Sequence, residues 1–292
     1  MNVTTAKRSR PKMGSRLLRP THEKVILWII SFFLAIYALS LIYPFFYLLF
    51  NSFKTNTEIL LHPFGFTSAP SFDSYRYVFE HYGIGEMFLN SLLLTVGETV
   101  ASMFFTVCAA YVLAKYEFPG NHFLYNLVLI CGMIPTIASL PSTYKLMAGS
   151  HLMGTYIGMV LLNCGAFGGS FLYLHSYFRG IPWDYAESAQ IDGAGDFTIF
   201  VRIMCPLAKN SIVTFTIIRF LGFWNDYWFP SLFYSNHPVL AVGLANLSSE
   251  ATNGFYSEYF AAMIIAVIPV LIFYAIFQKP LMTNTVEGGL KQ

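Results

Sequence analysis

Residues 187–195 read ESAQIDGAG, which brings two carboxylates and two glycines into a strongly apolar chain. The chain as a whole is 55% hydrophobic and only 11% charged. An unpaired carboxylate in the hydrocarbon of a membrane costs several kcal/mol. We therefore expect this stretch to lie in water or against another protein.

Long apolar runs make up most of the remaining sequence. A chain of 292 residues with 29 Phe and 19 Tyr has the composition of a membrane protein. A helix that crosses a bilayer needs about 20 apolar residues. The sequence thus predicts an all-α membrane protein with a transmembrane domain over 25–280, a basic tail over 1–24 and a short tail over 281–292. Its six predicted transmembrane helices are 25–50, 88–113, 123–145, 154–178, 211–233 and 257–278.

Basic residues indicate which side of the membrane each loop occupies, because cytoplasmic loops are enriched in Lys and Arg. The N-terminal tail carries Lys7, Arg8, Arg10, Lys12, Arg16, Arg19 and Lys24 against one acid, Glu23. With this tail inside, the other cytoplasmic segments carry six more cations and the outer loops three. We expect both termini in the cytoplasm, and we interpret the basic tail as a topology signal rather than a nucleic-acid site.

Motifs for metal binding or catalysis are not found. The four cysteines and seven histidines form no CxxC or HExxH pair, so no metal site is predicted. Ser170 and His175 are five residues apart and do not share a helix face, which disfavours an intramembrane hydrolase. No GxxxxGK[ST] phosphate-binding loop occurs, so any ATP-driven step needs a separate ATPase chain. We predict no catalytic residue.

The segment 179–209 predicts a helix–turn–helix hairpin outside the bilayer. Pro182 suits the first turn of a helix, and Asp184 and Glu187 favour its positive end. Gly193 and Gly195 flank a turn. Asp196 is expected to cap the second helix, whose apolar face at helical spacing is Phe197, Phe200, Val201 and Met204. Such a hairpin either folds back on its own bundle or presents a face to a partner subunit, and spacing alone leaves both open.

Two further features concern where predicted helices begin or are interrupted. Ser71 is a possible N-cap for a short amphipathic helix on the outer surface, after which the second span begins. Pro135 and Pro141 are expected to interrupt the third span.

The hairpin resembles the cytoplasmic motif of binding-protein-dependent ABC importer permeases, which reads EAA, three residues, Gly, nine residues, Ile, one residue, Leu-Pro. Here the motif is Glu187-Ser188-Ala189, Gly193, Ile203 and Cys205-Pro206, and every spacing matches. Ser188 and Cys205 depart in identity. IDGAGDFTIFVRI, FLNSL at 88–92, GFWNDYWFP at 222–230 and TVEGGLKQ at 285–292 resemble the carbohydrate-importing, maltose-type members.

This resemblance implies a subunit that forms half of a sugar-translocating pore in a bacterial cytoplasmic membrane. Its partners would be a second, homologous but different permease, two ATPase subunits that hold ATP and Mg, and an extracytoplasmic sugar-binding protein. The chain itself would bind no cofactor. The hairpin over 182–206 would couple to the ATPase through Asp184, Glu187, Ser188, Ala189, Asp192, Gly193, Ala194, Gly195 and Phe197, and the tail residues Glu287, Gly288 and Gly289 would also reach it.

Polar residues within the spans are candidates for the substrate path, because sugars bind through hydrogen bonds and ring stacking. The candidates are Arg219, Trp224, Asn225, Asp226 and Tyr227 in the fifth span. For Trp224, Asn225 and Asp226 the alternative is structural packing of the pore helix. For Arg219 and Asp226 a further alternative is pairing across the interface with the second permease. Glu98 in the second span would suit a proton-coupled secondary transporter, but the sequence shows no internal repeat of the kind such carriers have. We expect Glu98 to hydrogen-bond to a neighbouring helix.

Overall fold

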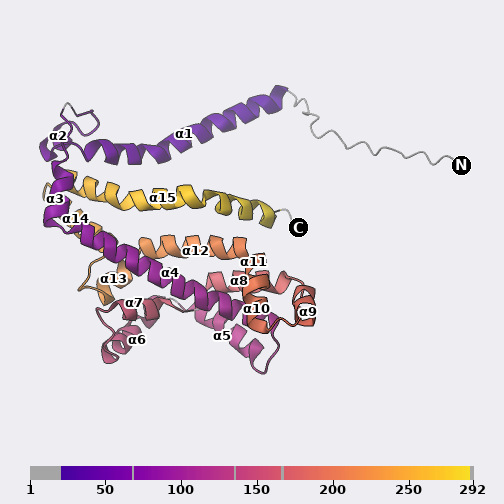
Figure 1. Cartoon of the computed structure of the whole chain (residues 1–292). Coiled ribbons are helices and arrows are strands. Elements are labelled where there is room, and N and C mark those ends of the chain that lie inside the picture. Colours follow the sequence, from indigo (N-terminus) through magenta and orange to yellow (C-terminus); the bar gives the residue numbers. More distant parts are fainter. Residues whose placement is uncertain (1–20, 68, 135, 166–167, 290–292) are drawn as a thin grey trace. The chain divides into compact units, whose positions relative to one another are not determined.

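The computed structural model describes residues 21–67, 69–134, 136–165 and 168–289, and its regular elements there are all helices (Figure 1). The basic tail predicted over 1–24 lies almost entirely outside these residues. The chain divides into two compact units, residues 1–47 and 48–292. Most of α1 (Thr21–Asn51) belongs to the first unit, and all the other helices belong to the second.

Among the described residues, three helices are long and apolar enough to cross a membrane, and they match the first, second and sixth predicted spans. They are α1, α4 (Ile84–Lys115) and the part of α15 (Tyr256–Gly289) up to Gln278. A rise of 1.5 Å per residue makes each longer than the roughly 30 Å hydrocarbon layer. The sixth helix extends beyond its predicted end at residue 278. α15 continues into the expected tail as far as Gly289.

The third predicted span is bent, and a second bend lies at residue 208, just before the fifth predicted span. α5 (Asn121–Met133) meets α6 (Thr136–Gly149) at 106°, and α10–α11 (196–207) meets α12 (Lys209–Trp224) at 78°. Counting each bent pair as one span gives five candidate spans in the part of the chain described. Pro141 does not break the third span as predicted, because α6 runs through it. Pro135, at the bend, lies outside the described residues.

The fourth predicted span is divided between α7 (Tyr156–Asn163) and α8 (Gly169–Gly180), neither of which is long enough to cross alone. The fifth also ends early, since α12 stops at Trp224 and a separate short helix, α13 (Trp228–Phe233), follows it. Irregular backbone at membrane depth is tolerated where it is surrounded by protein or lines a cavity.

α4 is the central helix of the second unit, where it contacts α7, α8, α12 and α14 (Leu240–Ala251) (Figure 1). Small hydroxyl residues form its buried stripe: Ser91, Thr95, Thr99, Ser102 and Thr106. Small side chains at a helix interface let neighbouring backbones approach closely. The stripe also carries Glu98, whose Oε1 accepts a hydrogen bond of 2.7 Å from Asn163 Nδ2 on α7. The predicted role of Glu98 as a helix–helix contact is confirmed.

Gly97 makes the approach of α7 to α4 possible. A Cβ at this position would lie 1.9 Å from the hydroxyl oxygen of Tyr156 and 3.3 Å from Val160 Cγ2. The Tyr156 hydroxyl reaches across to donate a 3.1 Å hydrogen bond to the Leu93 carbonyl. A larger residue at 97 would therefore displace the Tyr156 ring and its hydrogen bond.

The predicted outer segment folds as α2 (Asn56–Leu61) and α3 (Asp73–His81). Phe72, rather than Ser71, is the N-cap of α3, although Ser71 Oγ accepts the Asp73 N–H at 3.0 Å. Lys54 is buried and its ammonium donates to the His62 carbonyl at 2.9 Å, which neutralises the negative end of α2.

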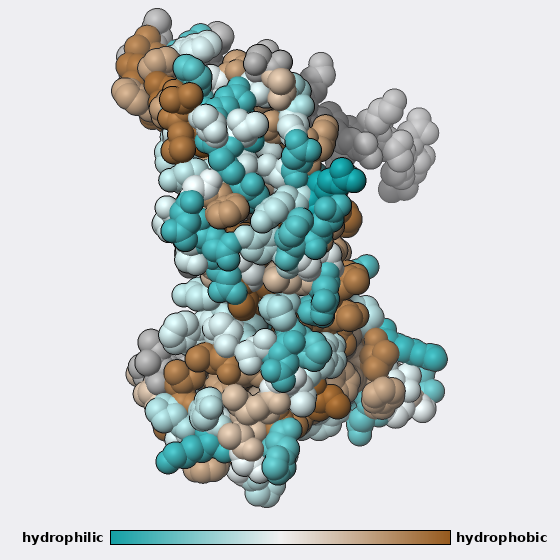
Figure 2. All heavy atoms as spheres, turned by 90° about the vertical axis from the view of Figure 1, so that its left-hand side faces the viewer, coloured by the Kyte–Doolittle hydropathy of each residue, from teal (hydrophilic) through white to brown (hydrophobic). Residues whose placement is uncertain are grey.

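Polar contacts tie this segment to the last helices. Asn56 donates to the Glu258 carboxylate of α15 at 2.9 Å, and Tyr82 donates to Glu250 of α14. Burial, with the added effect of Glu250, raises the pKa of the Tyr82 phenol above its usual value. Hydrophilic residues dominate the middle of the face that carries α3, as expected for segments outside a bilayer (Figure 2).

We predict that Gly97→Ala destabilises the protein by about 1–3 kcal/mol, the usual cost of forcing extra volume into a packed contact. The matched control is Gly132→Ala in α5, where a Cβ meets no atom within 4 Å. That variant should be neutral or slightly more stable. Thermal unfolding of the purified full chain in one detergent compares the two. Equal midpoints would contradict the assigned contact.

Candidate functional site

The hairpin predicted over 179–209 is present, and its first helix is α9 (Asp184–Ile191). Trp183 is the N-cap, and its carbonyl accepts the N–H groups of Ala186 (2.7 Å) and Glu187 (3.1 Å). Pro182 therefore precedes the helix instead of lying in its first turn. Asp184 and Glu187 are in that turn, where the positive end of the helix favours carboxylates.

The turn after α9 closes with the hydrogen bonds of a Schellman motif. The Gly193 N–H donates to the Gln190 carbonyl (3.0 Å), and the Ala194 N–H donates to the Ala189 carbonyl (2.9 Å). Gly193 has φ +84°, a left-handed conformation that residues with a Cβ rarely adopt. The predicted glycine turn is confirmed at Gly193, whereas Gly195 has an ordinary φ of −76°.

The second helix differs from the prediction in two respects. α10 (Asp196–Ile199) has Gly195 as its N-cap, so Asp196 is its first residue. A π-helical turn over Phe200–Met204 then widens the helix. The residues of the predicted apolar face differ in burial, because Phe197 and Val201 are exposed whereas Met204 is buried.

One side of the hairpin is fixed to the end of α4. Ala186 and Ala189 are buried in a core with Tyr111 of α4 and Phe178 of α8. The Lys115 ammonium donates to the Ile181 carbonyl at the end of α8.

Tyr116, which follows α4, holds the same side. Its hydroxyl donates to Asp196 Oδ1 at 3.2 Å, and its ring meets Trp183 edge to face at 5.9 Å. Sequence analysis missed Lys115 and Tyr116 as hairpin contacts because both lie more than sixty residues before it.

The other side of the hairpin is open. Ile191 is 87% exposed and Phe197 is 78% exposed. Large apolar side chains this exposed on a fixed element mark an interaction surface. The remaining predicted contact residues divide into the exposed Asp184, Glu187, Ser188, Asp192, Gly193 and Gly195, the half-buried Ala194, and the buried Ala189. Ile191 was missed, because its side chain has the apolar character of a core residue.

Two of the five residues predicted for a substrate path line one pocket of about 400 Å³. Arg219 and Asp226 contribute to it, together with Asn163 of α7 and Trp228 of α13. Arg219 Nε also donates to Ser170 Oγ at 3.2 Å. Asn163 was not predicted, since only the tertiary structure brings α7 beside the break after α12.

The other three candidates lie outside that pocket. Trp224 is buried, with its ring 5.8 Å from that of Phe88, and Tyr227 is exposed. Asn225 Nδ2 donates to the Leu221 carbonyl of its own helix at 2.8 Å. Asp226 Oδ1 accepts the N–H groups of residues 228 and 229, so it also caps the start of α13.

The remaining predicted sites are less defined. The backbone of Glu287, Gly288 and Gly289 is helical, as the last part of α15, and their side chains lie outside the described residues. Among the residues described, no three His, Cys, Asp or Glu side chains form a group that could hold a metal ion.

Comparison with known proteins agrees with the motif on the hairpin. The sequence profile of the family described as "Binding-protein-dependent transport system inner membrane component" matches residues 13–282. The chain belongs to this family. It is therefore a multi-pass inner membrane component of a transport system that depends on a binding protein, and such a component is non-catalytic.

Curated relatives of this family extend over nearly the whole chain. The diacetylchitobiose uptake system permease protein NgcG of Streptomyces coelicolor is 30% identical over 97% of this chain and 92% of its own length. The arabinooligosaccharides transport system permease protein AraQ of Bacillus subtilis is 32% identical over 90% of this chain and 95% of its own.

Solved structures support the same fold. A chain of a bacterial ABC transporter for import of the acidic polysaccharide alginate matches with a TM-score of 0.76 and 21% identity, over 89% of this chain and 98% of that one. A second alginate transporter structure, in complex with an oligosaccharide-bound periplasmic protein, matches with a TM-score of 0.62 and 17% identity over 91% and 98%.

We predict that Gly193→Ala destabilises the hairpin by about 1–2 kcal/mol, because alanine pays the left-handed penalty at φ +84°. Gly195→Ala is the matched control, since its φ is ordinary and a Cβ there meets nothing within 4 Å. Amide hydrogen exchange over α9 should be faster in the first variant alone. Equal exchange in both would contradict the strained turn.

Proposed function

We propose that this chain is the permease subunit of an ATP-driven importer of sugars or oligosaccharides and forms half of its translocation pore. The observation that carries the proposal is the hairpin, which is fixed to α4 on one side and presents exposed apolar residues on the other. Family membership and relatives named for oligosaccharide uptake support the class of substrate.

The topology that fits this function has six crossings of a bacterial cytoplasmic membrane, with both termini in the cytoplasm. In this arrangement α7 and α8 together make the fourth crossing, and the hairpin lies on the cytoplasmic side. The excess of Lys and Arg on that side supports the orientation. The transmembrane domain spans 25–280, between the cytoplasmic tails 1–24 and 281–292.

The hairpin over 182–206 couples the chain to an ATPase. Ile191 and Phe197 enter an apolar cleft of that partner, and Asp184, Glu187 and Asp192 supply a polar rim. Because the Schellman turn and the Lys115 and Tyr116 contacts make the hairpin rigid, motion of the ATPase reaches α4 as a rigid-body displacement. Two ATPase subunits hold the ATP and Mg, and this chain holds neither.

The substrate path includes the pocket lined by Arg219, Asp226 and Trp228. A guanidinium and a carboxylate beside an indole ring match the hydroxyls and the C–H face of a sugar. A second, homologous but different permease completes the pore, and an extracytoplasmic sugar-binding protein delivers the substrate. The periplasmic protein in the related alginate complex supports that last partner.

We predict that Phe197→Asp and Ile191→Asp each reduce co-purification of the ATPase about tenfold or more, because a charge is forced into an apolar contact. Phe79→Asp is the control, since Phe79 is an exposed apolar residue on α3, outside the hairpin. Glu187→Lys should also reduce docking. Membrane insertion should not change, and it is measured as the yield of full chain in the membrane fraction. Wild-type recovery of ATPase with both aspartate variants would refute the coupling role.

We predict that Arg219→Gln lowers ATP-dependent sugar uptake about tenfold while ATPase docking is retained, because a charged hydrogen-bond donor is lost from the path. Asn225→Ala should keep near-normal uptake, since that amide already bonds within its own helix. The measurement uses the complete transporter in proteoliposomes with labelled diacetylchitobiose and arabinooligosaccharides. Uptake that needs no ATP would contradict the proposed class, and normal uptake by Arg219→Gln would contradict the assigned path alone.

A further inference from the structure

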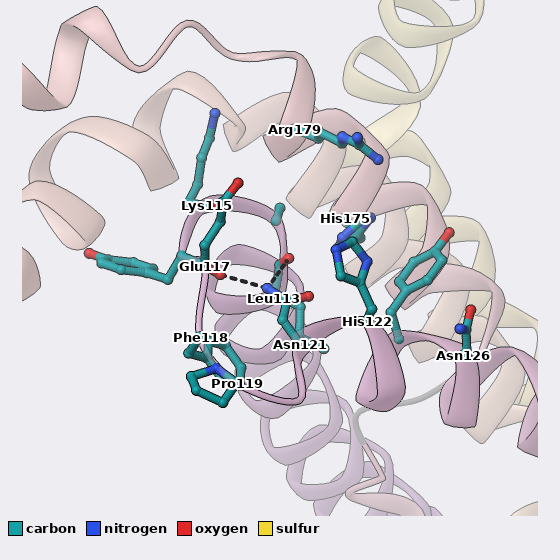
Figure 3. A pocket seen from close by; sticks show the side chains of 13 residues that line it. Leu113, Lys115, Glu117, Phe118, Pro119, Asn121, His122, Asn126, His175 and Arg179 are labelled. Atoms are coloured by element: carbon teal, nitrogen blue, oxygen red, sulfur yellow. Dashed lines mark hydrogen bonds between the residues drawn. The ribbon is translucent and has the colours of Figure 1, made fainter.

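A second pocket, of about 720 Å³, lies between the end of α4, the start of α5 and the C-terminal half of α8 (Figure 3). Four of its lining residues are basic, namely Lys115, His122, His175 and Arg179, against one acid, Glu117. Sequence analysis assigned no role to this cluster, because its members come from three helices. The transport function proposed above uses Lys115 and Tyr116 to hold the hairpin, but it assigns no ligand to the pocket.

Two of the basic groups in this pocket lie on the same face of one helix. His175 and Arg179 are four residues apart on α8 and so share one face of the helix. His175 is 7% exposed, and its ring lies 4.6 Å from that of Tyr125 on α5.

Arg179 forms no ion pair with a carboxylate within the described residues. The ion pair found there joins Arg76 to Glu80. Lys115 is different, because its ammonium already donates to the Ile181 carbonyl. The positive charge available to a ligand therefore comes chiefly from Arg179, and the two histidines add ring nitrogens.

The side of the pocket opposite α8, formed by the turn between α4 and α5, also favours an anion. Asn121 Nδ2 donates to the carbonyls of Leu113 (3.2 Å) and Tyr116 (2.6 Å), which locks the turn between α4 and α5. α5 begins at Asn121, and its N-cap, Gly120, offers no side chain to the first N–H groups. The positive end of this 13-residue helix thus forms part of the pocket next to Arg179 and the histidines.

We propose that this pocket binds a phosphate group carried on a larger molecule. A forked guanidinium, imidazole nitrogens and a helix N-terminus are the donors that phosphate oxygens prefer. The volume far exceeds that of phosphate alone, and Phe118 and Pro119 add an apolar wall for the rest of the ligand (Figure 3). The phosphate comes from an anionic phospholipid headgroup or from a phosphorylated metabolite. Basic pockets between membrane helices on the cytoplasmic side favour the headgroup.

The test uses the full chain in nanodiscs of phosphatidylcholine, with and without phosphatidylglycerol. Native mass spectrometry measures retained phosphatidylglycerol, and calorimetry in the phosphatidylcholine discs measures binding of glycerol phosphate and inorganic phosphate. The variants are Arg179→Gln and His122→Gln, both at exposed positions, and the matched control is Lys209→Gln, an exposed cation outside the pocket. Circular dichroism and thermal unfolding establish that each variant is folded.

We expect Arg179→Gln to weaken binding about tenfold and His122→Gln to weaken it less, with Lys209→Gln unchanged. Retention of phosphatidylglycerol without binding of the soluble probes assigns a lipid site, and binding of glycerol phosphate assigns a metabolite site. Either result supports the proposal. Binding that is equal in all three variants, or no binding of any probe, overturns it. None of these outcomes depends on transport, so failure here leaves the proposed function unaffected.

Discussion

The attachment of the hairpin to the end of α4 is the contact on which the functional argument depends. Lys115 holds Ile181, just before the first helix of the hairpin, and Tyr116 holds Asp196, the first residue of the second helix. The buried Ala186 and Ala189 pack between these two contacts. α4 then contacts α7, α8, α12 and α14 along its length. A displacement of the hairpin therefore cannot stay local, because the helix that receives it touches most of the second unit.

The small hydroxyl residues on α4 allow the short helices beside it to pack closely. Side chains as small as serine and threonine let α7 and α8 lie close, and Gly97 accepts the Tyr156 ring where a methyl group would not fit. The helix ends that result need partners for their polar groups, and Asp226 supplies one by capping α13. The same carboxylate faces the pocket shared with Arg219. A structural role and the proposed role in the substrate path thus meet at Asp226.

Sequence patterns predicted local features well and contacts between distant segments poorly. The length of the apolar runs was enough to predict α1, α4 and α15 as membrane-spanning helices. The turn at Gly193 was predicted from a glycine placed after a helix, and its φ is left-handed. Pro141 was read as a break, yet α6 continues through it. Phe197, Val201 and Met204 were placed on one apolar face, yet Phe197 and Val201 are exposed and Met204 is buried. The π-helical turn over Phe200–Met204 changes the helical period within that face. Helical period is a local assumption, and the protein departs from it where packing favours a wider turn.

The sequence by itself determined the membrane character, the hairpin and its motif, because hydrophobic length, glycine conformation and motif spacing are properties of contiguous residues. Only the tertiary structure decided which residues meet. It joined Asn163 to Glu98, Tyr116 to Asp196, and Arg179 and His175 of α8 to His122 of α5. The physical reason is that side-chain contacts in a helical membrane protein depend on the rotation and bend of each helix against its neighbours, and no stretch of one helix encodes the position of another.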